Sequence, residues 1–137
     1  ERAAAVGIGV ADAREIDTFD ILRATLLAMR RAVEALRVMP EYLLVDALTV
    51  PGIDVPQEGI VHGDRLCASI AAASIVAKVW RDALMRRLHA DWPAYRFDVN
   101  KGYGTPDHLE ALRSHGATPL HRLTFRSVLP RLAERAA

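Results

Sequence analysis

The sequence predicts an α/β fold with an α-helical C-terminal part. Short apolar runs typical of strands alternate with longer segments whose apolar residues recur at helical spacing. After the second long helical segment, the remaining signals are helices and glycine-containing loops. No internal repeat or low-complexity linker interrupts this order, and 137 residues are enough for one domain with its own core.

Three segments are predicted to be strands. Ala4–Val10 alternates loosely between small and β-branched residues. Tyr42–Val45 is a short apolar run that ends at Asp46, which favours a strand buried on both faces. Gly59–His62 is a further short strand, and the prolines and glycine before it indicate a loop.

Two long helices are predicted in the middle of the chain. Asp17 is expected to cap a helix that Pro40 closes. Its apolar residues recur at steps of three and four, and they are Phe19, Leu22, Leu26, Met29, Val33 and Leu36. Ser69–His89 is the second helix, which Pro93 ends. Its first half is nearly all small or apolar, so we expect that half to be buried against a sheet.

The C-terminal part predicts two further helices. The stretch from Tyr95 is not expected to be helical. Thr105 is expected to cap a helix with Pro106 in its first position, and Gly116 is expected to stop it. A last helix is expected over Ser127–Glu134.

Charge is divided unevenly along the chain. Residues 1–77 carry 7 basic and 11 acidic side chains, whereas residues 78–137 carry 11 basic and 6 acidic ones. Such a division suits a protein that holds cations in one part and a polyanion such as a nucleic acid in another. Chance patterning of a solvated surface is the alternative.

Composition excludes several classes of protein. Half of the chain is apolar and a quarter is charged, as in an ordinary globular protein. Cys67 is the single cysteine, which excludes an intrachain disulfide, and it has no obvious histidine partner for thiol catalysis. The five histidines show no zinc-type spacing. No apolar run reaches the length of a membrane span and no signal peptide opens the sequence, so we expect a cytoplasmic protein with no membrane partner.

Two aspartates follow predicted strands. Asp46 ends the Tyr42–Val45 run, and Asp64 follows the second short strand behind Gly63. Sites in open α/β sheets form at the carboxyl ends of strands. Two carboxylates there could share hard divalent cations such as Mg²⁺ or Mn²⁺. Alternatively, each aspartate caps a turn or the following helix.

Other polar residues are candidates for contacting a nucleic acid. Ser74, Lys78 and Asp82 recur every four residues and so share one helical face, which could meet phosphates or form a solvated stripe with a Lys78–Asp82 pair. Tyr103 lies in Lys-Gly-Tyr-Gly-Thr, where it either offers a flat face to a sugar or base or packs in a turn. His121 and Arg122 lie in a polar loop.

In this order, the segments of the chain resemble bacterial ribonuclease HII, from about residue 5 to about residue 130. The matching blocks are EIDTFDILRATLLAMRRAV, PEYLLVDAL, VHGD, SIAAASIVAKVWRD, YRFDVNKGYGTPDHLEAL, HGATPLHR and LTF. The order SIAAASIVAKVWRD, KGYGT and HR is highly specific to the family. The match corresponds to the C-terminal two-thirds of a ribonuclease HII.

The resemblance implies a ribonuclease H-like fold with four metal-binding carboxylates. Two are an adjacent Asp-Glu in a DEAGRG-type motif on the first strand, and the matching positions for the other two are Asp46 and Asp64. Tyr103 is expected to stack on the deoxyribose next to the ribonucleotide. The remaining residues expected to bind substrate are Ser74, Lys78, Lys101 and Arg122.

The resemblance also implies an activity. The family is expected to cut the RNA strand of RNA–DNA hybrids, and duplex DNA at single embedded ribonucleotides. Two Mg²⁺ or Mn²⁺ ions would bracket the scissile phosphate, and cleavage on the 5′ side of the ribonucleotide leaves a 5′-phosphate. We expect a monomer whose partners are RNA–DNA hybrids and ribonucleotide-containing duplex DNA.

Two departures from the family pattern affect these expectations. The 137 residues contain no DEAGRG-like segment, and Ala47 stands where the family usually has glycine. We therefore expect one domain that is incomplete at its N-terminus, with the sheet and helices in residues 1–92 and a basic helical part in residues 93–137. The chain alone is expected to be inactive. The alternatives are a non-catalytic nucleic-acid-binding remnant and another ribonuclease H-like nuclease.

Overall fold

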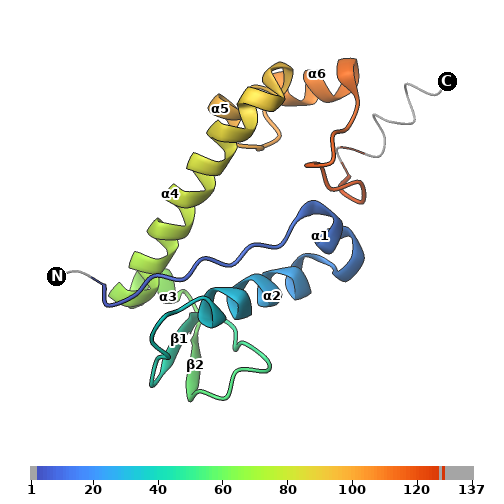
Figure 1. Cartoon of the computed structure of the whole chain (residues 1–137). Coiled ribbons are helices and arrows are strands. Elements are labelled where there is room, and N and C mark those ends of the chain that lie inside the picture. The colour runs from blue at the N-terminus through green and yellow to red at the C-terminus, as the bar shows by residue number, and fades with distance from the viewer. Residues whose placement is uncertain (1–2, 127, 129–137) are drawn as a thin grey trace. The chain divides into compact units, whose positions relative to one another are not determined.

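The computed structural model describes residues 3–126 and 128 (Figure 1). The chain divides into two compact units, Glu1–Ala77 and Lys78–Ala137. Each unit has its own elements, and helix α4 (Ala68–Asp91) contributes residues to both. The predicted helix over Ser127–Glu134 lies, apart from Val128, outside the described residues. Among the helices that are described, none is both long enough and apolar enough to cross a membrane.

Two helices open the first unit. Helix α1 (Ala13–Phe19) begins at Asp12, whose Oδ1 accepts from the Glu15 amide at 2.8 Å. Helix α2 (Ile21–Glu34) begins at Asp20, whose carboxylate accepts from the Arg23 amide at 2.9 Å. The prediction that Asp17 caps a single helix is therefore wrong. The backbone of Asp20 has φ +79°, and this left-handed residue divides the predicted helix in two.

The predicted strand Ala4–Val10 is not part of a sheet, because the sheet in the described residues has only two strands, β1 and β2. The segment instead runs against α2 through its glycines. A Cβ on Gly7 would lie 2.0 Å from the Ala32 carbonyl oxygen, and one on Gly9 would lie 1.9 Å from the Ala28 carbonyl oxygen. The small residues therefore permit close backbone packing on a helix instead of forming a ladder.

Arg31 of α2 forms hydrogen bonds both to the segment Ala4–Val10 and to α1. Its guanidinium donates to the Val10 carbonyl oxygen at 2.6 Å and to both carboxylate oxygens of Glu15, at 2.9 and 2.7 Å. Hydrogen bonding from Arg31 is the main cause that lowers the pKa of Glu15 to about 2. A bidentate pair of this kind fixes geometry as well as charge.

Strand β1 (Leu43–Asp46) confirms the predicted apolar run. It pairs in parallel with β2 (Gln57–Ile60), with Asp46 opposite Ile60. The expected burial on both faces is wrong, because Leu44 is 41% exposed. A strand is covered on both faces only when other elements lie over each face, and the alternating burial of β1 shows that one face is open.

Strand β2 begins and ends two residues before the predicted Gly59–His62. Its start is set by the Gln57 side chain, which accepts from the Val50 amide at 2.7 Å and donates to the Val50 carbonyl oxygen at 3.0 Å. This pair of bonds ties down the loop between the strands, and Val50 is buried there with 2% exposure. The strand cannot extend to His62, whose φ of +58° is left-handed.

Helix α4 confirms the second long helix but not its burial. Within α4, all of which is described, Ile70 is the one buried residue. The side chains of Ile75, Val76 and Val79 are 63%, 40% and 60% exposed. A sheet of two short strands offers too little surface to cover an apolar helix of this length.

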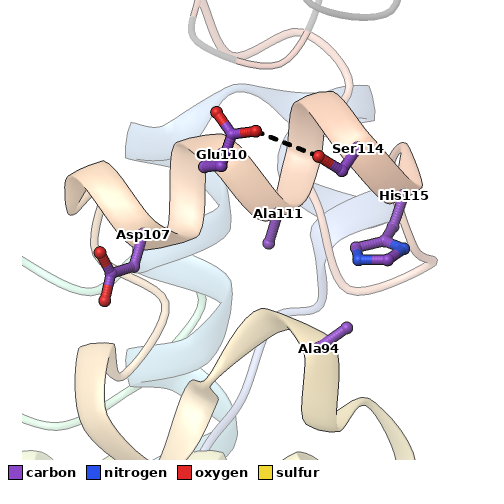
Figure 2. Close-up of a pocket in the computed structure, with 6 residues that line it drawn as sticks. All are labelled: Ala94, Asp107, Glu110, Ala111, Ser114 and His115. Atoms are coloured by element: carbon purple, nitrogen blue, oxygen red, sulfur yellow. Dashed lines mark hydrogen bonds between the residues drawn. The ribbon is translucent and has the colours of Figure 1, made fainter.

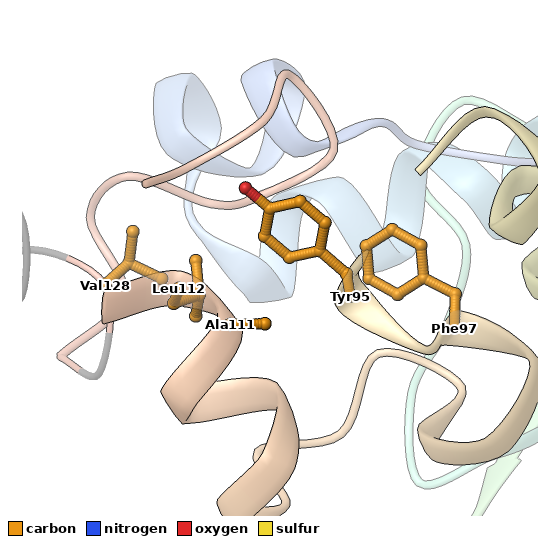
Figure 3. Packing of buried hydrophobic residues seen from close by; sticks show 5 residues of the cluster. All are labelled: Tyr95, Phe97, Ala111, Leu112 and Val128. Atoms are coloured by element: carbon orange, nitrogen blue, oxygen red, sulfur yellow. The ribbon is translucent and has the colours of Figure 1, made fainter. Parts of the chain in front are cut away.

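The second unit is built around an aromatic pair. The cluster of Tyr95, Phe97, Ala111, Leu112 and Val128, here called the C-terminal core, is buried (Figure 3). The rings of Tyr95 and Phe97 stack with centroids 5.6 Å apart. Burying rings of this size is the main apolar contribution available to so small a unit.

Three helical elements surround this core. The 3₁₀ helix Pro93–Tyr95 and α5 (Phe97–Asn100) show that the prediction of no helix after Tyr95 is wrong. Left-handed residues on both sides confine α5 to one turn, and these are Arg96 and Lys101. Helix α6 (Pro106–His115) confirms the predicted capped helix, with Thr105 as its N-cap and Gly116 as its C-cap.

We expect Gly9→Ala to destabilise the complete gene product that contains these residues by about 2–3 kcal/mol, because the new methyl group would overlap backbone atoms of α2. Denaturant unfolding measures the change. Gly104→Ala is the matched control, since its Cβ would meet only Leu109 Cδ2 at 3.9 Å. Equal stability of the two variants would show that Gly9 does not approach α2 as described.

Candidate active site

The two predicted metal-binding aspartates lie at the carboxyl end of the sheet. Asp46 is the last residue of β1, and its Oδ1 accepts a 2.8 Å hydrogen bond from the Gly63 amide. Asp64 follows directly in α3 (Gly63–Leu66), a single turn of helix after β2. Both aspartates are exposed. The hydrogen bond therefore brings the backbone beside Asp64 to the carboxylate of Asp46.

Gly63 makes this approach possible. A Cβ at Gly63 would lie 2.5 Å from Ile70 Cδ1 and 3.5 Å from the Asp46 Cα. Gly63 is buried, and so is Ile70 of α4 with 5% exposure. A side chain at position 63 would push α3 away from the strand end, so the residue before Asp64 has to be small.

Ala47 turns the chain sharply after Asp46. Its φ is +59°, and the Leu48 amide donates to the Asp46 carbonyl oxygen at 2.8 Å, across a single residue. A turn of this size with positive φ is rare and strained for a residue that carries a Cβ. The Ala47 amide donates to the Ile60 carbonyl oxygen at 2.9 Å, which keeps the turn attached to the neighbouring strand.

The chemistry of Asp46 and Asp64 fits a hard divalent cation, because carboxylate oxygens are the donors that Mg²⁺ and Mn²⁺ prefer. Their number does not make a full ligand set. In the described part of the chain, no three or more His, Cys, Asp or Glu side chains are grouped so that they could hold a metal ion. Two carboxylates would be half of the four-carboxylate set that the sequence resemblance implies.

Tyr103 is exposed and flanked by two cations. Its side chain is 55% exposed, with Lys78 Nζ 5.6 Å and the Arg81 guanidinium carbon 5.1 Å from the ring centroid. Lys78 also donates to Asp82 at 2.6 Å, as the four-residue spacing predicts. Sequence reasoning missed Arg81, although it lies three residues after Lys78 and hence near the same helical face.

Lys101 and Arg122 are engaged within the chain. Lys101 donates through Nζ to the Asp98 carbonyl oxygen, and the Arg122 guanidinium carbon lies 4.4 Å from the Phe125 ring centroid. Ser74 is exposed on α4. The candidates divide between the two units: Asp46, Asp64 and Ser74 lie in the first, and Lys78, Lys101, Tyr103 and Arg122 lie in the second.

A buried histidine pair was also missed. His108 Nε2 and His121 Nε2 are 3.0 Å apart, and His108 Nδ1 is 2.8 Å from the Tyr103 carbonyl oxygen. Burial is the main cause that lowers the pKa of His121 to about 4, and the positive charge that His108 can carry adds to it. Thirteen residues separate the two histidines in the sequence, so no local spacing indicates the pair.

An open pocket of about 290 Å³ lies beside α6 (Figure 2). Its lining residues are Ala94, Asp107, Glu110, Ala111, Ser114 and His115. The charged groups there are already paired, since Asp107 accepts from Arg96 and Glu110 from Arg113. None of the residues predicted to carry chemistry lines this pocket.

Comparison with known proteins identifies the family. The ribonuclease HII family model matches residues 2–128, and the chain belongs to that family. It is 54% identical over 132 residues to ribonuclease HII of Desulfitobacterium hafniense (strain DSM 10664 / DCB-2), covering 96% of this chain and 51% of the relative. It is 56% identical over 128 residues to ribonuclease HII of Lactobacillus delbrueckii subsp. bulgaricus, covering 93% and 50%.

A solved structure confirms the predicted fold class. The crystal structure of the ribonuclease H2 from Pyrococcus horikoshii OT3 matches with a TM-score of 0.67 at 20% sequence identity. The match covers 90% of this chain and 66% of that chain. The predicted α/β, ribonuclease H-like fold is therefore confirmed. The chain spans about half the length of the curated relatives it matches.

We expect Ala47→Gly to stabilise the complete gene product by about 1 kcal/mol, because glycine adopts the +59° φ of this turn without the Cβ penalty. The gain is smaller than the full penalty because glycine is also more flexible in the unfolded chain. Denaturant midpoints measure this change in stability. The control is Ala35→Gly, which should lose stability because Ala35 has an ordinary right-handed backbone conformation. A loss at position 47 as well would show that the turn is not strained.

Proposed function

We propose that this chain carries half of the active site of a ribonuclease H-type endonuclease. The substrates would be RNA–DNA hybrids and duplex DNA with embedded ribonucleotides, cut on the 5′ side of the ribonucleotide to leave a 5′-phosphate. One observation carries the proposal: in a chain of this family, the Asp46 carboxylate at the end of β1 accepts a hydrogen bond from the amide of Gly63, the residue before Asp64. Membership of the family argues against another kind of ribonuclease H-like nuclease.

Asp46 and Asp64 are the residues that would hold Mg²⁺ or Mn²⁺ here. When bound, such ions supply Lewis-acid chemistry for phosphodiester hydrolysis. The Gly63 amide occupies one oxygen of Asp46, which orients the carboxylate and leaves its other oxygen available. Asp64 lies in the first turn of α3 and is open to solvent, so an incoming phosphate does not have to displace protein.

The second unit supplies the contacts proposed for the nucleic acid backbone and sugar. Lys78 and Arg81 place two positive charges beside the exposed Tyr103 ring. An aromatic face next to cations suits a sugar that carries phosphates on both sides. This arrangement supports Tyr103 as the residue that stacks on the deoxyribose next to the ribonucleotide.

One alternative has its own supporting observation. The 137 residues contain no Asp-Glu-x-Gly-Arg-Gly segment, and two carboxylates bind a hard cation more weakly than four. A chain that binds nucleic acid without cutting it would show the same Tyr103 surroundings. Cleavage assays separate the two functions, whereas binding assays do not.

We expect Asp46→Asn to abolish cleavage of a duplex with one ribonucleotide while leaving duplex binding intact, because the change removes a metal-binding charge but keeps the side-chain shape. Gel-resolved cleavage by the complete gene product measures this. Asp54→Asn, in the exposed loop of the same unit, is the matched control. Activity of the Asp46 variant within about tenfold of the parent, or about 1.4 kcal/mol in barrier, would refute the assignment.

We also expect residues 1–137 expressed alone to show no metal-dependent cleavage. A fusion should cleave if it places, before this chain, the segment that precedes the matched region in the Desulfitobacterium hafniense protein. The family resemblance implies that the remaining carboxylates lie in that segment. Asp46→Asn in that fusion is the control that ties the activity to this chain. Cleavage by residues 1–137 alone would mean that other side chains complete the site, and a folded fusion that binds without cutting would favour the non-catalytic alternative.

A further inference from the structure

We propose that His108 and His121 form a neutral, proton-ordered pair that positions the Tyr103 loop for substrate. The inference rests on the proposed function, in which Tyr103 contacts the sugar. The two imidazoles are positioning residues because both are buried, with 5% and 9% exposure, and so act through Tyr103.

Backbone groups at the two ends of the pair fix where its protons lie. The Thr118 amide donates to His121 Nδ1 at 3.0 Å, and an amide N–H can only donate, so this nitrogen carries no proton. Neutral His121 then carries its proton on Nε2 and donates it to His108 Nε2, 3.0 Å away. His108 must carry its own proton on Nδ1, where it donates to the Tyr103 carbonyl oxygen at 2.8 Å.

The other end requires the same arrangement. A carbonyl oxygen can only accept, so the Tyr103 carbonyl independently requires a proton on His108 Nδ1. The Thr118 hydroxyl, 2.9 Å from His121 Nδ1, can donate as well and does not oppose this order. One pair of tautomers therefore satisfies every hydrogen bond in the chain from Thr118 to Tyr103.

An added proton breaks the chain wherever it binds. On His108 it would place two N–H groups against each other across 3.0 Å, and on His121 it would face the Thr118 amide. Burial also opposes the positive charge that a proton would bring to His121, whose ring centroid lies 5.2 Å from that of Tyr95. The other titratable groups at this position are the Tyr95 phenol and His115, 6.1 Å from the Tyr95 ring.

The sign of the pH dependence follows from the lowered pKa of His121, about 4 against an ordinary 6.5. A lowered folded-state pKa means that the contribution to stability is complete above about 6.5 and is lost as the pH falls towards 4. The Tyr103 loop should therefore be held firmly at neutral pH and loosen in acid.

The pair acts on the backbone of Tyr103 and leaves its ring free. The Tyr103 carbonyl oxygen accepts from His108 and also from the Thr105 amide at 2.8 Å. On its N-terminal side, the loop passes through Lys101 and Gly102, with φ of +52° and +79°. A backbone fixed on both sides presents the exposed ring in one orientation beside the cations of α4.

The test compares substitutions that keep or remove each hydrogen bond, in the complete gene product. His108→Asn keeps a donor near the Nδ1 position, and His121→Gln keeps one near Nε2, whereas His108→Leu and His121→Leu keep neither. We expect the leucine variants to lower kcat/KM on a duplex with one ribonucleotide about tenfold, as the loss of one buried hydrogen bond implies. The Asn and Gln variants should recover most of this loss.

Combination with Tyr103→Ala shows whether the pair acts through Tyr103. We expect His108→Leu to have little further effect in the Tyr103→Ala background, because the residue it positions is gone. An equal loss in both backgrounds, or equal activities of the Leu and Asn variants, would overturn the positioning role. Parent-level activity of Tyr103→Ala itself would instead overturn the sugar contact of the proposed function.

Histidine ¹⁵N NMR provides a readout independent of activity and of whether the leucine variants fold. At neutral pH we expect His121 protonated on Nε2 and His108 on Nδ1, with His121 titrating near its lowered pKa of about 4. Rapid tautomer exchange, or the opposite tautomers, would overturn the ordered pair whatever the kinetic result.

Discussion

The hydrogen bond between the Gly63 amide and Asp46 Oδ1 is the constraint on which the candidate metal site depends. It joins the end of β1 to the start of α3, so the Asp46 carboxylate and the backbone next to Asp64 cannot separate without breaking it. The bond requires a parallel pairing that places Asp46 opposite Ile60, and it requires a glycine that lets α3 approach Ile70. The register of the strands and the packing of α3 after them thus together determine where the Asp46 carboxylate meets the Gly63 amide.

Elements with strong local signals could be predicted from the sequence. Helix α6 has its cap, its proline and its terminal glycine within the segment itself, and all three act as expected. The cap at Asp20 could not be predicted, because the break inside this amphipathic pattern depends on one backbone angle at Asp20 that side-chain periodicity does not encode. Burial of β1 and α4 could not be predicted, because it depends on which other elements lie against them.

The candidate site divides in the same way. Asp46 and Asp64 could be proposed as metal ligands because each follows a predicted strand, which can be read directly from the order of residues in the sequence. Arg81 beside Tyr103, and the pair of His108 with His121, arise from contacts between segments distant in sequence. The spacing of Arg81 from Lys78 places both near one face of α4, but no residue pattern indicates that Tyr103 lies beside that face or that the two histidines meet.

The Gln57 side chain at the start of β2 has a consequence for chemical ageing. It offers the Val50 backbone one donor and one acceptor, as a neighbouring strand would. Because the side chain is uncharged, these two hydrogen bonds are insensitive to salt. Deamidation would replace its NH₂ group with an oxygen of nearly the same size. That oxygen would face the Val50 carbonyl with no proton between them and a negative charge added. Hydrolysis of one amide, without any change of shape, would therefore turn a bond into a repulsion at the start of β2.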